Sequence, residues 1–329
     1  MKRVTLLLIV VATIVVLLFI GRLYVTENDF SPSNPLWNGM ASLAYSGHVR
    51  PLYTLDGLSY SGNEDKLLIV SPSVNYTDAE SAMILSFMND GGQVIVMDDY
   101  GTSNSLLDKV GSSISLVQVP LCQEEEYYKR PSFPLVTGIL PSGVTDNVTS
   151  AVFNHPVSLD VKEGAEIIVY TSGLGWLDLN DNCLIDGIEK FGSYPVAAEM
   201  IYGSGKLVVI GDPDIMINSM LDKGDNAILA SNILGGGTVY LDSSHGQEIS
   251  PLARVLYVLR HDFLAQSLFI LVVLATGYLY IQRYQIIRLF RKPVTEGPEK
   301  IDVKASIVDY MRLKLPLKEK DLREIKKKL

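Results

Sequence analysis

Two long apolar runs near opposite ends of the chain limit its organisation more than any other feature. The first covers residues 4–20 and follows Lys2 and Arg3, and the second covers residues 263–281 and precedes the basic residue Arg283. Each run is long enough, or nearly so, to cross about 30 Å of hydrocarbon as a helix. Lys and Arg are enriched on the cytoplasmic flanks of membrane helices. We therefore expect both chain ends in the cytoplasm and the residues between the runs outside.

These runs divide the chain into five expected segments. They are a cytoplasmic N-terminus (1–3), a transmembrane signal anchor (4–22), an extracytoplasmic domain (23–262), a second transmembrane helix (263–281) and a basic cytoplasmic tail (282–329). The first run could instead be a cleaved signal peptide. Residues 19–23 contain no small-x-small cleavage site, which favours the uncleaved anchor.

The charge is divided unevenly between these segments. Residues 23–262 carry 11 basic and 30 acidic residues, a net charge of −19, and residues 283–329 carry 14 basic and seven acidic residues, a net charge of +7. An acidic domain is a poor nucleic-acid binder and suits cations or basic partners, although acidity can also serve solubility alone. The tail 301–329 either docks a cytoplasmic partner, contacts the anionic leaflet or is simply a solvated positive-inside tail.

The middle of the chain alternates short apolar, β-branched runs with helical patterns. We expect strands at residues 66–71, 93–97, 166–170, 196–201, 206–211 and 238–241, and helices at residues 77–89, 103–110, 213–221 and 225–234. Thr77 and Glu80 form a capping box at one helix start. Residues of about 120–150, rich in proline, interrupt the rhythm as an insertion or long loop. Strands of this kind predict an α/β fold with a mostly parallel, doubly wound sheet.

A twelve-residue acidic segment, residues 178–189, is close to the calcium-loop pattern of EF-hands. Position 6 of this segment is Cys183, where a glycine normally permits a sharp turn. Two interpretations of the segment remain open: a calcium-binding loop, and a plain turn with side-chain-to-backbone hydrogen bonds. Under the calcium hypothesis the ligands are the side chains of Asp178, Asn180, Asn182, Asp186 and Glu189 and the backbone carbonyl of Leu184.

A second polar group follows the expected strands. In open α/β sheets ligands bind outside the carboxyl ends of the strands, so these residues could line one cleft. Asp and Asn are also good helix N-caps, which is the alternative interpretation. The candidate residues are Asp98, Asp99, Asp212, Asp214, Asn218, Asp225, Asn226 and His245.

The sequence contains no recognisable catalytic set. It lacks a G-x-S-x-G elbow, a Walker A loop and an H-E-x-x-H motif. Neither Cys122 nor Cys183 directly follows an expected strand, so we expect no cysteine nucleophile. A disulfide between them is permitted outside the cytoplasm, but their spacing does not establish one. Asn75 and Asn147 begin glycosylation sequons, whose use the sequence leaves open.

Several motifs in order resemble a known family. They are the segments at residues 31–39, 91–104, 176–189, 195–199, 211–218 and 225–226. The set is similar to archaeal membrane proteins that carry the domain of unknown function numbered 4350, over residues of about 30–245. The resemblance implies a class I glutamine-amidotransferase-like α/β domain between two transmembrane helices, without the catalytic triad. It also implies membrane or envelope protein partners and no established activity.

These features predict a two-pass membrane protein with a non-catalytic extracytoplasmic α/β domain. Its expected role is recognition of a carbohydrate, a cation or a protein, within an envelope complex. The alternative is a metal-assisted hydrolase that uses acidic residues at the strand ends. That alternative requires two or more of these residues to converge on one pocket.

Overall fold

A computed structural model of the chain describes residues 28–44, 49–62, 64–246, 263–290 and 303–328. The chain divides into two compact units. One unit comprises residues 19–262, and the other comprises residues 1–18 and 263–329. The first unit contains the α/β domain.

The α/β domain is built on an eight-stranded sheet. The strand order is β1 (Val49–Leu52), β13 (Val239–Asp242), β2 (Lys66–Val70), β3 (Gln93–Met97), β12 (Gly205–Ile210), β11 (Pro195–Tyr202), β9 (Ala165–Tyr170) and β6 (Gly138–Ile139). The first five strands are parallel to one another. The last three pair antiparallel. The predicted α/β class with a mostly parallel sheet is confirmed.

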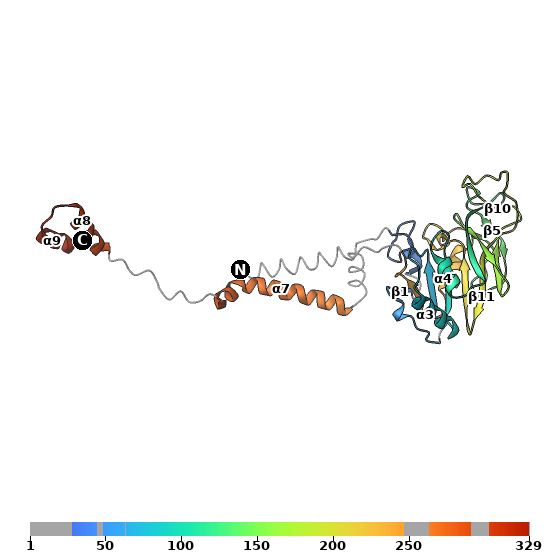
Figure 1. Ribbon diagram of the computed structural model, residues 1–329, viewed down its shortest axis with the longest axis horizontal. Helices are drawn as coiled ribbons and strands as arrows, with labels where there is room; N and C mark the ends of the chain where they lie inside the picture. The colour runs from blue at the N-terminus through green and yellow to red at the C-terminus, as the bar shows by residue number, and fades with distance from the viewer. Residues whose placement is uncertain (1–27, 45–48, 63, 247–262, 291–302, 329) are drawn as a thin grey trace. The chain divides into compact units, whose positions relative to one another are not determined.

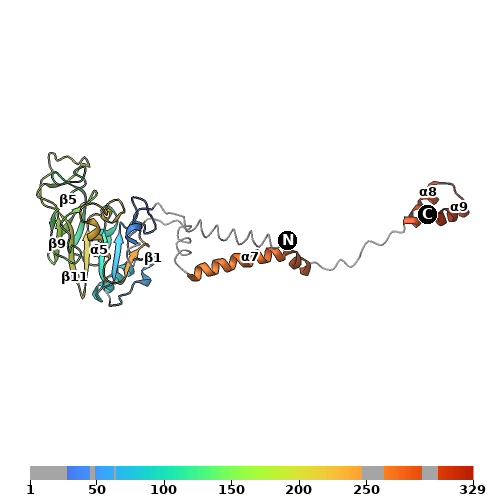
Figure 2. The same ribbon diagram turned by 180° about the vertical axis from the view of Figure 1, so that it is seen from behind.

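Helices cover both faces of this sheet. Helices α3 (Asp78–Asn89) and α4 (Ser103–Lys109) pack on one face, where Ile84 and Leu106 join a core with Val94 of β3. Helix α5 (Asn226–Leu234) packs on the other, where Ile233 joins a core with Ile95. Neighbouring residues of a strand point to opposite faces, which explains why apolar runs without polar alternation form these strands. Figure 1 shows α3 and α4, and Figure 2, seen from behind, shows α5.

The N-terminus of α3 has the capping box that the sequence predicts. The Thr77 hydroxyl accepts a hydrogen bond from the Glu80 backbone N–H (3.3 Å), and the Glu80 carboxylate accepts one from the Thr77 N–H (2.8 Å). Two otherwise unpaired backbone donors are thereby satisfied.

The region around residues 120–150 is more structured than a single loop. It contains the end of β4 (Ile114–Gln123) and the short strands β5 (Leu135–Val136) and β6. Strand β4 lies between β10 (Gly175–Leu177) and β8 (Val157–Val161) in a separate three-stranded sheet, and β5 pairs with β7 (Ala151–Val152). Pro120 lies within β4, where the pairing with β8 shifts register. A proline fits a strand at such an irregularity because it has no N–H to donate.

The helix expected at residues 213–221 is wrong. Only a short 3-10 helix, η2 (Asp214–Met216), forms there; the other short helices are η1 (Leu55–Gly57) and α2 (Ala41–Ala44). The Asn218 N–H donates to the carbonyl of Gly39 (2.8 Å), far away in sequence. This tertiary bond diverts the chain where a helix would have used the same donor internally.

The second unit contains α7 (Phe263–Phe290) and two helices of the tail, α8 (Val303–Lys314) and α9 (Glu319–Lys328). Residues 315–318, which include Pro316, separate the two tail helices, because a proline inside a helix removes a backbone donor and breaks or kinks the helix. Val308 and Leu322 are buried in this tail, and the Arg312 guanidinium contacts the Glu319 carboxylate at 2.8 Å.

The second apolar run, residues 263–281, lies within α7. Among the described residues, no helix has both the length and the apolar character needed to cross a membrane. The transmembrane helix predicted at 263–281 is therefore not supported. The signal anchor predicted at 4–22 lies outside the described residues.

Candidate functional site

The carboxyl ends of β13, β2, β3 and β12 meet at one edge of the sheet because these strands are parallel. From β3 the chain continues to α4 on one face, and from β12 it continues to α5 on the opposite face. Such a divergence opens a crevice at the strand ends of open α/β sheets. Asp98, Asp99, Asp212 and Asp214 all lie where these two strands end.

Asp98 has a structural role at this edge. Its fully buried carboxylate accepts backbone hydrogen bonds from Asp99 (2.9 Å), Gly101 (2.9 Å) and Ser103 (3.0 Å). Burial raises the pKa of Asp98, and these hydrogen bonds offset part of that rise. Ser103 is the first residue of α4, whose N-cap residue is Thr102, so Asp98 is not the N-cap but does accept a backbone N–H that the start of the helix leaves unpaired.

The carboxyl groups of buried Asp212 and half-buried Asp214 both accept hydrogen bonds from Asn154. The Asn154 backbone N–H donates to Asp212 (2.6 Å), and its side-chain amide donates to Asp214. Burial and the neighbouring Asp214 hold the pKa of Asp212 well above its ordinary value. Burial, with the charges of Asp99 and Asp29, raises the pKa of Asp214 to about 7. A carboxyl group with such a pKa can exchange protons near neutral pH.

Two predicted sites come within electrostatic range of each other at Tyr100. Burial and the charges of Asp99, Asp181, Asp178 and Asp212 raise the pKa of Tyr100 to about 12. Residues of the acidic loop at 178–189 and strand-end carboxyl groups thus both lie near Tyr100. Among the described residues, however, no three His or carboxylate ligand atoms here lie within 4.8 Å of one another.

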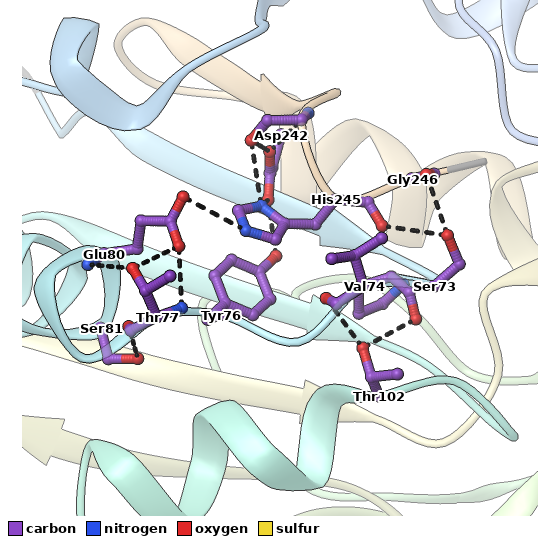
Figure 3. Close-up of polar contacts among 12 residues, drawn as sticks. Ser73, Val74, Tyr76, Thr77, Glu80, Ser81, Thr102, Asp242, His245 and Gly246 are labelled. Atoms are coloured by element: carbon purple, nitrogen blue, oxygen red, sulfur yellow. Dashed lines mark hydrogen bonds and ion pairs between the residues drawn. The ribbon is translucent and has the colours of Figure 1, made fainter. Parts of the chain in front are cut away.

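His245 sits at the end of β13 in a closed polar cluster (Figure 3). Its Nδ1 lies 2.9 Å from Asp242 and its Nε2 lies 3.5 Å from Glu80. The Tyr76 hydroxyl donates to the same Asp242 oxygen (2.6 Å), and the Tyr76 ring stacks on the imidazole with centroids 3.8 Å apart. His245 is only 4% exposed. Both ring nitrogens face carboxylates, so the cluster links the end of β13 to α3, and a place for His245 in a ligand cleft stays a prediction.

The protonation of His245 follows from these contacts. Burial lowers the pKa of the imidazole, but the hydrogen bond and charge of Asp242 and the charge of Glu80 together outweigh it, so the pKa is raised. Burial raises the pKa of Asp242, and its hydrogen bonds with His245, Ser244 and Tyr76 outweigh that effect, so its pKa is lowered. The cluster therefore favours an imidazolium between two carboxylates.

Three further candidates form hydrogen bonds to other segments of the chain, and their place in a ligand cleft stays a prediction. The Asn218 amide donates to the carbonyls of Asn34 (3.1 Å) and Leu36 (2.6 Å). Asp225 makes no side-chain cap to α5 and accepts the backbone N–H and the hydroxyl of Thr149. Asn226 is buried, accepts the Val152 N–H and donates to the Val152 carbonyl.

The acidic loop at 178–189 draws its predicted ligand side chains together. Asp178 is buried, and its two oxygens accept the N–H groups of Asn182 (3.1 Å) and Cys183 (2.6 Å). Asp186 Oδ2 accepts the amides of Asn180 (3.0 Å) and Asn182 (3.2 Å). Three of the five predicted side chains, those of Asn180, Asn182 and Asp186, thus meet within the loop.

Backbone groups complete this arrangement. Glu189 accepts the N–H groups of Leu179 (2.8 Å) and Asp186 (3.0 Å), and the Leu184 N–H donates to Asn182 Oδ1 (2.7 Å). Such side-chain-to-backbone bonds are those of the plain-turn interpretation, and the loop has no helix on either side within residues 171–195. The carboxylate and amide oxygens fit calcium by type, so the calcium site stays a prediction.

A disulfide fixes the loop at its sixth position. Cys183 is bonded to Cys122 of β4, with the two Cα atoms 6.0 Å apart. Cys183 has a φ of 52°, the left-handed conformation that a glycine normally supplies there. The disulfide and the bond to Asp178 hold this conformation, so the missing glycine does not prevent the turn. Among the described residues, the cysteines and Asp178 form the single group of three metal-type ligand atoms, and its sulfurs are oxidised.

The same loop exposes an unusual number of apolar side chains. We call residues 178–191 the stapled loop. Its exposed apolar residues are Leu179 (53% exposed), Leu184 (67%), Ile188 (75%) and Phe191 (46%). Clustered apolar exposure marks interaction surfaces more often than single exposed residues do.

A cavity of about 650 Å³ lies away from all predicted site residues, at the amino ends of the strands. Its walls include Lys66, Gln93 and Lys206, which occupy paired positions at the starts of β2, β3 and β12. A smaller cavity of about 60 Å³ lies at the carboxyl edge, between residues 28–32 and the end of β13.

Sequence reasoning missed several residues of these clusters. Asn154, whose Oδ1 is buried without a hydrogen-bond partner among the described residues, follows β7 and carries no motif. Tyr76 and Asp29 likewise have no local signal, because their roles depend on contacts with distant segments. The sequence identified Glu80 as part of the capping box of α3, but it did not indicate the contact of Glu80 with His245.

Comparisons with known proteins give a family and distant structural likenesses. No curated protein matches the chain. Solved structures similar to it include "mmIFT52 N-terminal domain" (22% identity, 50% of this chain and 72% of that chain, TM-score 0.39). Cytoplasmic protein STM3548 from Salmonella typhimurium is 11% identical (52% and 70% covered, TM-score 0.31), and a β-galactosidase from Rahnella sp. R3 is 13% identical (51% and 21% covered, TM-score 0.29).

These structural likenesses are too distant to bear on function. The family match is more extensive, because it covers residues 34–234, which include most of the sheet and the stapled loop. The chain belongs to the family described as "Domain of unknown function (DUF4350)".

Proposed function

We propose that this chain is a two-pass membrane protein whose extracytoplasmic α/β domain binds a protein partner and carries out no catalysis. The two apolar runs with basic outer flanks support the membrane topology. The proposal includes the glutamine-amidotransferase-like form of the α/β fold and a place in an envelope complex, which the family resemblance implies. The disulfide supports the absence of a cysteine nucleophile, because an oxidised sulfur cannot act as a thiolate.

The observation that carries the recognition role is the apolar surface of the stapled loop. Leu179, Leu184, Ile188 and Phe191 are exposed on a backbone that Asp178 and the disulfide hold in place. A preorganised contact surface loses less conformational entropy when it binds. A partner would therefore meet apolar side chains that are already positioned.

Charge around the stapled loop indicates the chemistry of the partner. Asp181 and Asp186 are exposed within it and Glu189 is partly exposed, and the exposed run 124–126, all glutamate, directly follows β4, to which the disulfide ties the loop. Interfaces pair complementary potentials around an apolar centre. We propose a partner with an apolar contact surface bordered by Lys and Arg.

Calcium is part of this proposal. Asp178, Asn180, Asn182, Asp186 and Glu189 would hold the ion in the stapled loop, and the ion would supply positive charge to these carboxylates. The hydrogen bonds of the Asn180 and Asn182 amides to Asp186 support the assignment, because they already bring three of these side chains together.

Site-specific photo-crosslinking in native membranes tests the recognition role. A photoreactive residue at Ile188 should capture one defined protein, and the Leu184→Ser/Ile188→Ser double substitution should abolish its co-purification. Ile201→Ser is the matched control, because Ile201 is 66% exposed on β11. Co-purification that survives the double substitution contradicts the proposal.

A hydrolase is the second candidate, and the pKa of Asp214 is the observation that favours it. An acid–base catalyst needs a pKa near the working pH, and burial and the charges of Asp99 and Asp29 raise that of Asp214 to about 7. The arrangement of ligand atoms does not favour the metal-assisted form. Hydrolysis of a glycoside or ester panel that Asp214→Asn abolishes would select this candidate over recognition.

A further inference from the structure

We infer that residues 35–37, a Pro-Leu-Trp turn, form a contact site for the lipid bilayer surface. The inference rests on the proposed two-pass organisation and adds a second apolar surface to the domain. Leu36 is 43% exposed and Trp37 is 68% exposed, and Pro35 between them and Asn34 is also exposed. Three consecutive exposed apolar residues are uncommon on a soluble surface unless they contact something.

The turn is held firmly from beneath. Buried Asn34 accepts the Leu36 N–H at its side-chain oxygen (2.8 Å). Asn218 donates to the Leu36 carbonyl (2.6 Å), and the Ser219 N–H donates to the Trp37 carbonyl (3.1 Å). Gly39 approaches so closely that a Cβ there would lie 1.9 Å from the Asn34 carbonyl oxygen. The polar residues of this segment thus serve the backbone, and the apolar ones face outward.

The turn lies beside the point where the chain arrives from the first apolar run. The Asn34 amide donates to the carbonyl of Asn28, the first described residue (3.0 Å). Seven residues lie between Ile20 and Asn28, so an extended chain of eight Cα–Cα steps between them spans at most about 28 Å. Gly246, after which the chain continues toward α7, lines the same 60 Å³ cavity as Asn28. Both connections of the domain are therefore on the side of the turn.

The amino-acid composition around residues 35–37 favours lipid over a protein as the contact of this turn. Tryptophan favours the membrane–water interface because its ring is apolar and its N–H is polar. No Lys or Arg occurs from residue 23 to residue 49, whereas Glu27 and Asp29 are acidic. Contact through this turn should therefore depend on apolar insertion and not on anionic headgroups. It should persist in a zwitterionic bilayer and at high salt.

Fluorescence of the full chain in phosphatidylcholine vesicles tests the inference, because the sequence has only two tryptophans. Trp176 is fully buried, so the difference between wild type and Trp37→Phe reports Trp37 without relying on a core substitution. Lipids brominated along the acyl chain should quench the Trp37 emission and leave the Trp176 emission unchanged. The quenching should be unaffected by added salt or by anionic lipid.

The matched control moves the exposed tryptophan to the opposite edge of the sheet. In the Trp37→Phe background, Ile201→Trp places it at the amino ends of the strands, at a position of 66% exposure. Its emission should resist brominated lipid and respond to aqueous acrylamide. A Trp37 that responds to acrylamide and not to brominated lipid overturns the inference, and shielding from both quenchers overturns it in favour of a protein occupant.

A separate measurement, alkaline extraction of the vesicles, tests the proposed two-pass topology independently of the lipid contact. A chain that alkaline extraction removes from the vesicles contradicts the two-pass organisation itself. A chain that is retained but shows an unquenched Trp37 contradicts only the lipid contact.

Discussion

At the residue scale, His245 joins the end of β13 to the start of α3 through a charge that depends on pH. Its pKa is raised in the folded state, since Asp242 and Glu80 outweigh the opposing effect of burial. Stability from this imidazolium is therefore complete below the ordinary pKa of 6.5 and is lost as pH rises through the raised pKa. We expect the free energy of unfolding to fall over that range, and the fall should be smaller in His245→Gln, where the raised pKa values of Asp212 and Asp214 still lower the stability as pH rises. Denaturant titrations at several pH values measure it.

His155 supplies the control for this experiment. Burial and the charge of Arg130 lower its pKa, so its contribution has the opposite dependence on pH. The His155→Gln variant should retain the loss of stability at higher pH. Equal curves for wild type and His245→Gln would contradict the charged cluster.

The Tyr76 hydroxyl gives a second prediction at this scale. Its hydrogen bond to the Asp242 carboxylate is buried, and bonds to charged groups contribute about 1.5–3 kcal/mol. Tyr76→Phe should lower the free energy of unfolding at neutral pH by about that amount. The stacking face on His245 is retained in Phe, so an unchanged stability would mean that the hydroxyl contributes nothing.

For several site residues the sequence predicts where they lie in the fold but not what their side chains contact. Asp98, Asp99, Asp212 and Asp214 follow apolar strands, and the geometry of parallel sheets places them at one edge. Their roles depend on distant partners such as Asn154, which no local pattern indicates. Asn218 and Asn226 look like cleft residues in the sequence, yet their amides bond to backbone groups of other segments.

At the element scale, the stapled loop should respond to calcium. Extracellular calcium modules bind with constants of about 10⁻⁴–10⁻³ M, and a ligand at tenfold excess over its constant stabilises the folded state by about 1.4 kcal/mol. We expect millimolar calcium to raise the thermal midpoint of the protein. Asp186→Asn should abolish the rise, because Asp186 lies where Asn180 and Asn182 converge.

Asp181→Asn is the matched control for charge. Asp181 lies in the same loop at the fourth position, which supplies no ligand in the calcium pattern, and it is exposed. Its removal should leave the calcium response in place. A midpoint that calcium does not change in the wild type leaves only the plain turn.

Elements with continuous apolar runs were predictable, and those defined by long-range pairing were not. The strands β2, β3 and β12 are buried on both faces, so their sequences identify them without alternation. A continuous apolar run does not indicate whether a strand pairs parallel or antiparallel. For this reason the sequence could not distinguish the antiparallel strands β9 and β11 from parallel strands. Strand β4 was missed because Pro120 makes its second half look like a loop, although β8 and β10 pair with it on both sides.

At the scale of the whole molecule, labelling of single introduced cysteines tests the proposed membrane topology. The two native cysteines are bonded to each other, so they leave a low background for thiol labelling. In intact cells a membrane-impermeant maleimide should label Glu163→Cys in the α/β domain and should label Ser306→Cys in α8 only after permeabilisation. Both positions are exposed. Labelling of Ser306→Cys in sealed cells contradicts cytoplasmic placement of the tail.

The two connections of the α/β domain meet at one small cavity, where Asn28 and Gly246 are both wall residues. Domains with adjacent ends tolerate insertion into a host protein and circular permutation. A short linker from Gly246 to Asn28, with new termini opened at exposed Gly143, should give a permuted domain that keeps its fold. We therefore expect that the domain keeps its fold when it is inserted into a surface loop of an unrelated protein.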